Sequence, residues 1–284
     1  MSSKLAGGGF FKSNLFLRIC SAAVLAPLVL IVGWFGGWPF YALVLLVSIA
    51  VQYEWARICR PNTSNTVLLL LATLCAFELL LVQLKQFDIA LLALLIAIGS
   101  LAAYGVVNPQ KRWIGIGHAY AILFGVALLF FRHDVTFGVA ALAFVIGVVW
   151  VTDTFAYFVG RAVGGPKLWV SVSPGKTWSG AIGGAVAGFL FGFILSLFVA
   201  ETSGLYLAVV GLLLSCVSQL GDLFESWVKR RKGVKDSGQL IPGHGGMMDR
   251  VDGLIFASLT ALIIAFVQNP EYNQLGTVLL FGYR

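Results

Sequence analysis

Charged residues are scarce in this chain. They make up 11% of its 284 residues, whereas hydrophobic residues make up 59%. Soluble domains carry about a quarter charged residues, so this scarcity and a mean hydropathy of +0.93 exclude an ordinary soluble protein. They indicate an integral membrane protein. The apolar runs are continuous rather than alternating, which excludes a water-filled β-barrel. We find neither a soluble domain nor a convincing internal repeat.

Cysteine is also sparse, with four residues that show no metal-binding spacing: Cys20, Cys59, Cys75 and Cys216. They lie in or beside apolar stretches, so we expect them to be small buried hydrophobic side chains. The net charge of +7 is compatible with nucleic-acid binding. The cations lie between apolar segments rather than over a soluble surface, however, which favours a membrane protein with no nucleic-acid partner.

The apolar segments predict an all-α, polytopic membrane helix bundle. A span needs roughly 20 apolar residues, and about nine segments approach this length. They cover residues 19–35, 38–53, 67–84, 89–107, 119–131, 136–159, 180–200, 205–225 and 253–267. Residues 1–13 are expected to form a flexible N-terminus, because Met1 to Gly9 are small and polar with three consecutive glycines. An uncleaved first span is favoured over a signal peptide.

The distribution of cations predicts the orientation of the bundle. With the N-terminus in the cytoplasm, only Lys85, Arg132 and Arg284 of the 19 Lys and Arg residues fall on the outer side. Such asymmetry follows the positive-inside rule. It places the loops 160–179 and 226–252 together in the cytoplasm, where nucleoside triphosphates are found. Residues 14–135 form an apolar N-terminal group of helices, and residues 136–284 hold nearly all the polar groups of interest.

Carboxylates gather at the ends of the last two spans. Asp222 closes one span, Asp249 and Asp252 open the next, and Asp153 lies inside the sixth. Acids at membrane depth usually have a partner or a function. Asp249 and Asp252 are three residues apart, hence on one helical face. Mg²⁺ is commonly held by one or two carboxylates plus phosphate oxygens, so these acids predict a magnesium site.

Cations lie beside these acids. Lys229, Arg230, Lys235 and Arg250 suit phosphate binding, since arginine offers a bidentate fork. The alternative is that the acids merely pair with Arg230 and Arg250. Two further cations, Arg231 and Lys232, are interpreted as a topology signal or a patch for anionic lipids. His244 lies among glycines, which permit close approach of a ligand, or it is an ordinary hydrogen-bonding loop residue.

A second polar loop, residues 171–180, precedes the seventh span. Its Gly175-Lys176-Thr177 resembles part of a P-loop, but Val170 occupies the position of the required glycine and no flanking strand is predicted. Lys176 and Thr177 at a helix N-terminus still suit a phosphate, and Thr177 or Ser179 could simply cap that helix.

Four glycines in the seventh span, spaced four apart, share one helical face. Gly180, Gly184, Gly188 and Gly192 permit close helix approach. Packing within the bundle is the favoured use, and a homodimer contact is the alternative.

One stretch of 27 residues resembles the signature of phosphatidate cytidylyltransferases (CDP-diacylglycerol synthases). The matching positions are Ser226, Val228, Lys229, Arg230, Lys235, Asp236, Gly238, Ile241, Pro242, His244, Gly245, Gly246, Asp249, Arg250 and Asp252. The segments Gly221-Asp222-Leu223 and Ser173-Pro174-x-Lys176-Thr177-x-x-Gly180 also resemble that family, and residues 153–160 resemble it more loosely.

The resemblance implies a bacterial inner-membrane enzyme that uses CTP and phosphatidic acid and releases pyrophosphate. It implies dependence on a divalent metal, either one Mg²⁺ or Mg²⁺ with a second metal ion. Asp222 and Asp249 would hold the metal, with Asp252 as a further ligand. Phosphates would be held by Lys176, Thr177, Lys229, Arg230, Lys235 and Arg250. Substrates would be oriented by Ser173, Ser226, Asp236 and His244.

Two other functions compete with this one. A CTP-dependent lipid kinase would transfer the γ-phosphoryl group and release CDP. A secondary transporter of phosphorylated solutes would use intramembrane acids as ion sites. It would need inverted repeats with polar residues in both halves, whereas here they crowd one half.

Overall fold

Ten helices account for almost all of the architecture described by the computed structural model, which covers residues 27–108, 112–199, 202–241 and 245–282. Eight of these helices are long and apolar enough to cross a membrane. They are α2 (Gly37–Cys59), α3 (Asn65–Gln83), α4 (Phe87–Val107), α5 (Arg112–His133), α6 (Gly138–Val163), α7 (Trp178–Ser196), α8 (Gly204–Arg231) and α9 (Met248–Gln268). They confirm eight of the predicted spans. The first, residues 19–35, lies largely outside the described residues, although 27–35 are helical.

Several helices extend beyond their predicted ends. Helix α8 continues to Arg231, and α6 continues to Val163. The predicted loops 160–179 and 226–252 are therefore too long. Three cations, Lys229, Arg230 and Arg231, occupy the last turn of α8, where they suit the negative end of the helix dipole. At 1.5 Å per residue α8 is roughly 42 Å long, so it exceeds the hydrocarbon core of a bilayer, which is about 30 Å thick.

A short antiparallel hairpin between α6 and α7 was not predicted. Strand β1 (Lys167–Trp169) pairs with β2 (Ser173–Thr177), and Trp178 N donates to Pro166 O at 3.0 Å. Gly164 and Gly165, with φ of 66° and 100°, let the chain turn out of α6. A strand thus contains Gly175-Lys176-Thr177 itself, rather than preceding a phosphate loop, so the P-loop assignment remains excluded.

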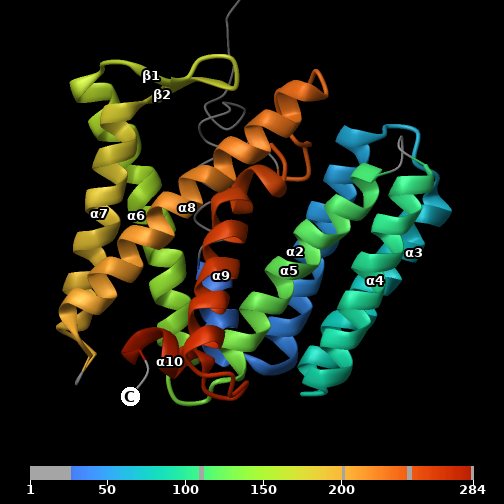
Figure 1. Ribbon diagram of the computed structural model, residues 1–284, viewed down its shortest axis with the longest axis horizontal. Helices are drawn as coiled ribbons and strands as arrows, with labels where there is room; N and C mark the ends of the chain where they lie inside the picture. Colours follow the sequence, from blue (N-terminus) through green and yellow to red (C-terminus); the bar gives the residue numbers. More distant parts are fainter. Residues whose placement is uncertain (1–26, 109–111, 200–201, 242–244, 283–284) are drawn as a thin grey trace, which may run out of the picture.

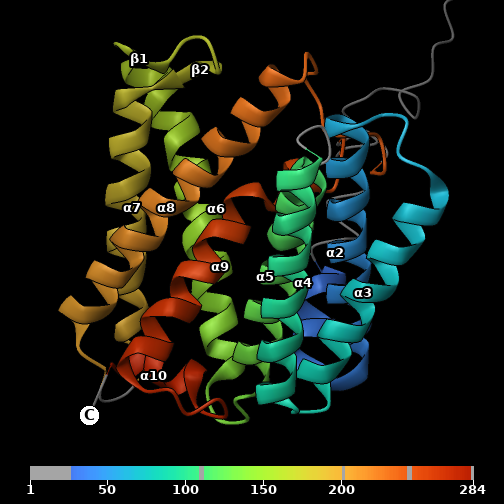
Figure 2. The same cartoon turned by 45° about the vertical axis from the view of Figure 1, so that its right-hand side comes forward.

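The helices form two groups joined by α9. In Figures 1 and 2, α6, α7 and α8 lie together on one side, α2 to α5 lie on the other, and α9 passes between them. The hairpin and the C-terminal end of α8 share one end of the bundle, whereas α10 (Leu275–Phe281) lies at the opposite end. Aromatic rings connect the groups: Trp55 of α2 stacks on Phe224 of α8 at 6.1 Å between centroids.

The glycine face of α7 packs inside the bundle. A Cβ atom at Gly184 would meet Thr152 O of α6 at 2.9 Å, and one at Gly192 would meet Leu207 O of α8 at 2.2 Å. Close approach of α7 to both neighbours requires glycine here. The prediction of internal packing is confirmed, and a dimer contact through this face is excluded because the face is already covered.

The structure adds a buried polar cluster in the N-terminal half and corrects one of the cysteine predictions. Glu78 and His118 lie 3.0 Å apart, and Gln52 contacts the other ring nitrogen of His118 at 2.9 Å, which ties α2, α3 and α5 together. Cys75 is buried as predicted, but Cys216 is exposed. The burial prediction is wrong for Cys216, because an apolar side chain in a span can face lipid instead of protein. Cys20 lies outside the described residues.

Candidate functional site

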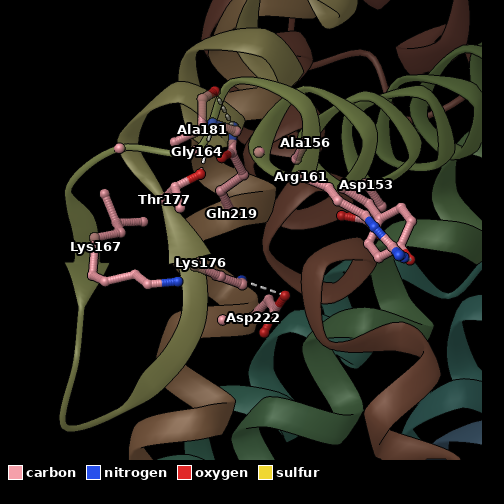
Figure 3. A pocket seen from close by; sticks show the side chains of 16 residues that line it. Asp153, Ala156, Arg161, Gly164, Lys167, Lys176, Thr177, Ala181, Gln219 and Asp222 are labelled. Atoms are coloured by element: carbon pink, nitrogen blue, oxygen red, sulfur yellow. Dashed lines mark hydrogen bonds and ion pairs between the residues drawn. The ribbon is translucent and has the colours of Figure 1, made fainter.

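A polar cavity of about 580 Å³ opens between α6, the hairpin, α7 and α8. Charged side chains line it from each of these elements except α7: Asp153 and Arg161 from α6, Lys167 from β1, Lys176 from β2 and Asp222 from α8. Figure 3 shows them converging on the hollow beneath the hairpin. A cavity with both signs of charge, at the end of a membrane bundle, suits an anionic ligand together with a cation.

Lys176 and Asp222 form the central ion pair of this cavity. The Lys176 ammonium contacts one carboxylate oxygen of Asp222, and Ser226 donates to the other at 3.4 Å. The side chains of Lys176 and Asp222 are 29% and 32% exposed, so a bound ligand can reach both. A residue of the predicted loop 160–179 and a residue at the end of the predicted span 205–225 are therefore brought together, across a sequence separation of 46 residues.

Thr177 closes the cavity at the start of α7. Its hydroxyl accepts from Gly180 N at 3.1 Å and lies 3.0 Å from Ser179 Oγ. It is the N-cap residue of α7, as one of the two sequence interpretations proposed. The cap leaves other backbone N–H groups of the first turn without helical partners, as at the start of any α-helix.

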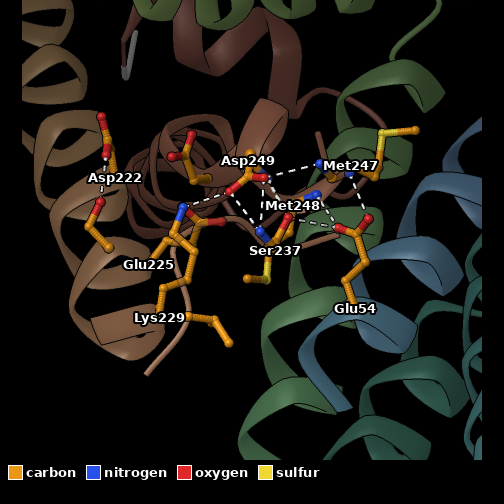
Figure 4. A network of polar contacts seen from close by, with 12 residues as sticks. Glu54, Asp222, Glu225, Lys229, Ser237, Met247, Met248 and Asp249 are labelled. Carbon is orange, nitrogen blue, oxygen red and sulfur yellow. Dashed lines mark hydrogen bonds and ion pairs between the residues drawn. The ribbon is translucent and has the colours of Figure 1, made fainter. Parts of the chain in front are cut away.

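A second polar network lies at the start of α9. Lys229 donates to Glu225 at 2.7 Å and to Asp249 at 2.6 Å, and it is buried. Asp249 also accepts from the backbone N–H groups of Ser237 at 3.0 Å and Gly246 at 3.1 Å. Both oxygens of Asp249 are thus used by donors of the protein itself. The Lys229 ammonium is likewise engaged by the protein, because it is held between the carboxylates of Glu225 and Asp249 (Figure 4).

Glu54 is the residue of this network that the sequence analysis missed. It comes from α2 in the N-terminal half and is 1% exposed. Its carboxylate accepts from Met247 N at 3.0 Å, Met248 N at 2.8 Å and Ser237 Oγ at 3.0 Å. Because no side chain at the N-cap position caps α9, Glu54 supplies the cap from another helix. The sequence feature that could have identified Glu54 is a lone acid at the end of an apolar span.

Two glycines of the signature leave room for Glu54. A Cβ at Gly238 would lie 2.6 Å from Glu54 Oε1, and one at Gly246 would lie 2.6 Å from Oε2 and 1.8 Å from Ser237 Oγ. The Glu54 carboxylate therefore sits in a cradle that side chains would fill. The loop between α8 and α9 is folded around a residue that is distant in sequence.

The carboxylates of the site are the candidate ligands for a metal ion. Across the described ranges, no three His, Cys, Asp or Glu side chains are grouped closely enough to hold one by themselves. Asp222 and Asp252 come from adjacent helices, which nearly touch where a Cβ at Gly221 would meet Asp252 O at 2.7 Å. Two carboxylates with phosphate oxygens suffice for Mg²⁺, so the donor set fits.

The remaining predicted residues lie outside the cavity lining. Lys235 and Asp236 are exposed in the loop between α8 and α9, and Ser173 is half-buried in β2. Arg230 donates to Val234 O at 2.9 Å and is exposed. Arg250 is exposed in the first turn of α9. His244 lies outside the described residues.

This sequence is similar to those of known proteins over most of its length. Residues 16–268 match the family model described as the cytidylyltransferase family. A phosphatidate cytidylyltransferase of Brucella abortus biovar 1 (strain 9-941) is 42% identical over 261 residues, which cover 91% of this chain and 96% of that protein. A phosphatidate cytidylyltransferase of Rickettsia bellii (strain RML369-C) is 34% identical over 264 residues, covering 90% and 91%.

Proposed function

Because this chain belongs to the cytidylyltransferase family, we propose that it transfers the cytidylyl group of CTP to phosphatidic acid in the membrane. The products are CDP-diacylglycerol and pyrophosphate, as in phospholipid biosynthesis. The observation that carries this assignment is the Lys176–Asp222 pair, which faces a cavity of about 580 Å³ at the end of eight membrane-spanning helices. A lipid head group and a soluble nucleotide can meet only at such a level.

In the transfer, an oxygen of the phosphatidate phosphate attacks the α-phosphorus of CTP. A new P–O bond forms, and the bond between the α-phosphorus and the bridging oxygen breaks, so that the electron pair leaves with pyrophosphate. The attacking oxygen is already an anion, so no strong general base is needed. Catalysis then comes from alignment and charge neutralisation.

The charged side chains of the cavity supply that neutralisation. Lys176, Arg161 and Lys167 present cations to the phosphates from three directions. Arg161 is steadied by a 2.8 Å hydrogen bond to the Tyr157 hydroxyl. A bound Mg²⁺ would neutralise phosphate charge and align the reacting oxygens. Asp222 and Asp252 are the residues that would hold it. Asp249 would serve as a further ligand only after releasing Lys229.

We also propose that the cavity faces the cytoplasm, since 16 of the 19 Lys and Arg residues fall on the same side as the hairpin and the α8–α9 loop in the topology predicted from the sequence. The substrate CTP is then available on the correct side. The phosphatidate would enter from the adjacent leaflet with its acyl chains remaining in the bilayer.

Product analysis tests the proposed reaction. Purified protein is incubated with phosphatidic acid, Mg²⁺ and CTP labelled separately at the α- and γ-phosphates. Appearance of the α-label in lipid, with the γ-label released in pyrophosphate, is the expected result. The γ-label in lipid would instead identify a lipid kinase. Absence of any labelled lipid from a folded preparation would contradict both transfer reactions and favour transport.

A further inference from the structure

A second charged cavity lies at the end of the bundle opposite the candidate active site. It has a volume of about 310 Å³ and is lined by Lys85, Arg132 and His133 together with Phe35, Phe40 and Gln83. Helix α2 connects the two ends, since Gly37 lines this cavity and Glu54 lies in the active-site network. The axial distance between these two residues is roughly 25 Å, so the cavity is separate from the proposed active site.

The cations of this cavity form no ion pair with an acid of the described residues. Lys85 is exposed, and no ion pair joins it to any acid in the described part of the chain. The Nε2 atom of His133 is buried and has no partner among those residues. Asp134, next in sequence, is saturated by Thr136 N at 2.9 Å, Phe137 N at 3.0 Å and both donors of Thr277. The cavity therefore has positive charge to offer an anion.

Arg132 is held in place at the cavity wall. Its Nε donates to Gly33 O at 2.9 Å and its Nη2 to Trp34 O at 2.9 Å, which are carbonyls at the end of the helix 27–35. A Cβ at Gly36 would lie 2.3 Å from the guanidinium carbon, so the glycine leaves the space that the guanidinium fills. These contacts use neutral acceptors and leave the positive charge of Arg132 available.

Lys85 occupies a backbone conformation that favours glycine. Its φ is 59°, the only positive value at a non-glycine residue of the described chain, and it ends α3 through a 2.9 Å bond from Lys85 N to Val82 O. Glycine or asparagine is usual at such a helix end.

The surroundings place the cavity at the level of lipid head groups. Trp34 and Phe35, beside the cavity, are 70% and 74% exposed, and Trp38 is exposed one helical turn onward. Exposed aromatic residues of this kind mark the membrane–water interface. We propose that this cavity binds the phosphate of an anionic phospholipid from the leaflet opposite the active site, with Lys85 and Arg132 as its cationic partners.

The test is lipid binding by the purified full-length protein in detergent. Short-chain phosphatidylglycerol is titrated, and binding is followed by native mass spectrometry and by the thermal unfolding midpoint. Lys85→Gln removes a charge that forms no ion pair with the described residues, and it is expected to weaken the binding about tenfold, as for loss of one charged partner. Lys85→Gln/Arg132→Gln is expected to abolish it, provided that it folds.

Two control variants and two control ligands decide the outcome. Arg60→Gln removes a cation at the other end of the bundle, and Lys176→Gln alters the active-site cavity; both are expected to retain the binding. Phosphatidylcholine and inorganic phosphate are the control ligands, and both should bind more weakly than phosphatidylglycerol. Equal binding by Lys85→Gln and the unaltered protein, or equal binding of phosphatidylcholine, would overturn the proposal. If inorganic phosphate raised the thermal unfolding midpoint as much as phosphatidylglycerol does, the cavity would bind free phosphate rather than a lipid head group.

Discussion

At the scale of single residues, Glu54 shows how a membrane helix without catalytic groups of its own can control a catalytic loop. Its carboxylate accepts three hydrogen bonds from the segment that carries Ser237 and the start of α9. Ser237 in turn donates its backbone N–H to Asp249. Glu54 is therefore a positioning residue, because it acts on Asp249 through the loop rather than by reaching the cavity.

Glu54→Gln is expected to lower kcat by at least about tenfold with a smaller change in KM. The amide would present an NH₂ group to a site that holds only donors, and a buried unpaired donor costs about 1–3 kcal/mol. Glu54→Asp retains an acceptor-only group and should restore part of the activity. The measurement is steady-state cytidylyl transfer, with exposed Glu271→Gln as the control. Equal activity of the Gln and Asp variants would contradict the positioning role.

Asp222 and Lys229 allow catalysis and stability to be separated. Asp222→Asn should lower activity roughly 10²–10³-fold, as expected when an electrostatic group at a reacting centre is lost. Its unfolding free energy should change by less than about 1 kcal/mol, since the pair with Lys176 is solvent-accessible. Lys229→Met should instead destabilise the protein by about 3–5 kcal/mol, because it removes the cation that pairs with the buried Glu225 carboxylate and with Asp249.

These two substitutions are compared by activity assay and by thermal unfolding in detergent. An Asp222→Asn protein with near-normal turnover would remove Asp222 from the reaction. A Lys229→Met protein that is fully stable would show that the Glu225–Lys229–Asp249 network is not a structural requirement.

At the scale of the helices, glycine determines how closely α7 approaches its neighbours. Gly192→Ala is expected to destabilise the protein by about 1–3 kcal/mol, because its Cβ would meet Leu207 O at 2.2 Å and α7 would have to shift from α8. Gly99→Ala in α4 is the matched control, since a Cβ there meets nothing within 4 Å. It should be neutral or stabilising by up to about 1 kcal/mol. Thermal unfolding midpoints of the two proteins measure the difference.

A similar effect of the two alanines would mean that α7 can move freely from α8, against the packing described above. A large loss of stability in Gly99→Ala alone would indicate a contact of α4 with another molecule, because the side of α4 at that position is open within the chain.

At the scale of the whole molecule, the sequence predicts the elements better than their contacts. Apolar length alone identifies eight spans, because a bilayer requires about 20 apolar residues whatever their neighbours are. Lys176 and Asp222 could be assigned to one site because both carry charges at the ends of spans on one side. The pairing of Lys229 with Glu225 and Asp249 could not be predicted from the sequence, since each acid was equally suited to bind a metal ion.

The hairpin and Glu54 escaped prediction for physical reasons. Strand β1 has three residues, too few for a periodic pattern, and its pairing depends on the turn at Gly164 and Gly165. The contacts of Glu54 cross about 190 residues of sequence, from α2 to Met247 and Met248. They arise only when α2, α8 and α9 pack together, which no local signal encodes.

The sidedness of the bundle gives the last prediction. The hairpin, the α8–α9 loop and Glu54 share one end, and Lys85 and Arg132 share the other. In a protein with its native cysteines replaced by serine, Gln239→Cys and Val135→Cys place single thiols at exposed positions of the two ends. A membrane-impermeant maleimide applied to whole cells should label Val135→Cys at once and Gln239→Cys only after permeabilisation. The reverse pattern would put the candidate active site outside, where CTP is not supplied, and would refute the proposed orientation while leaving the fold unchanged.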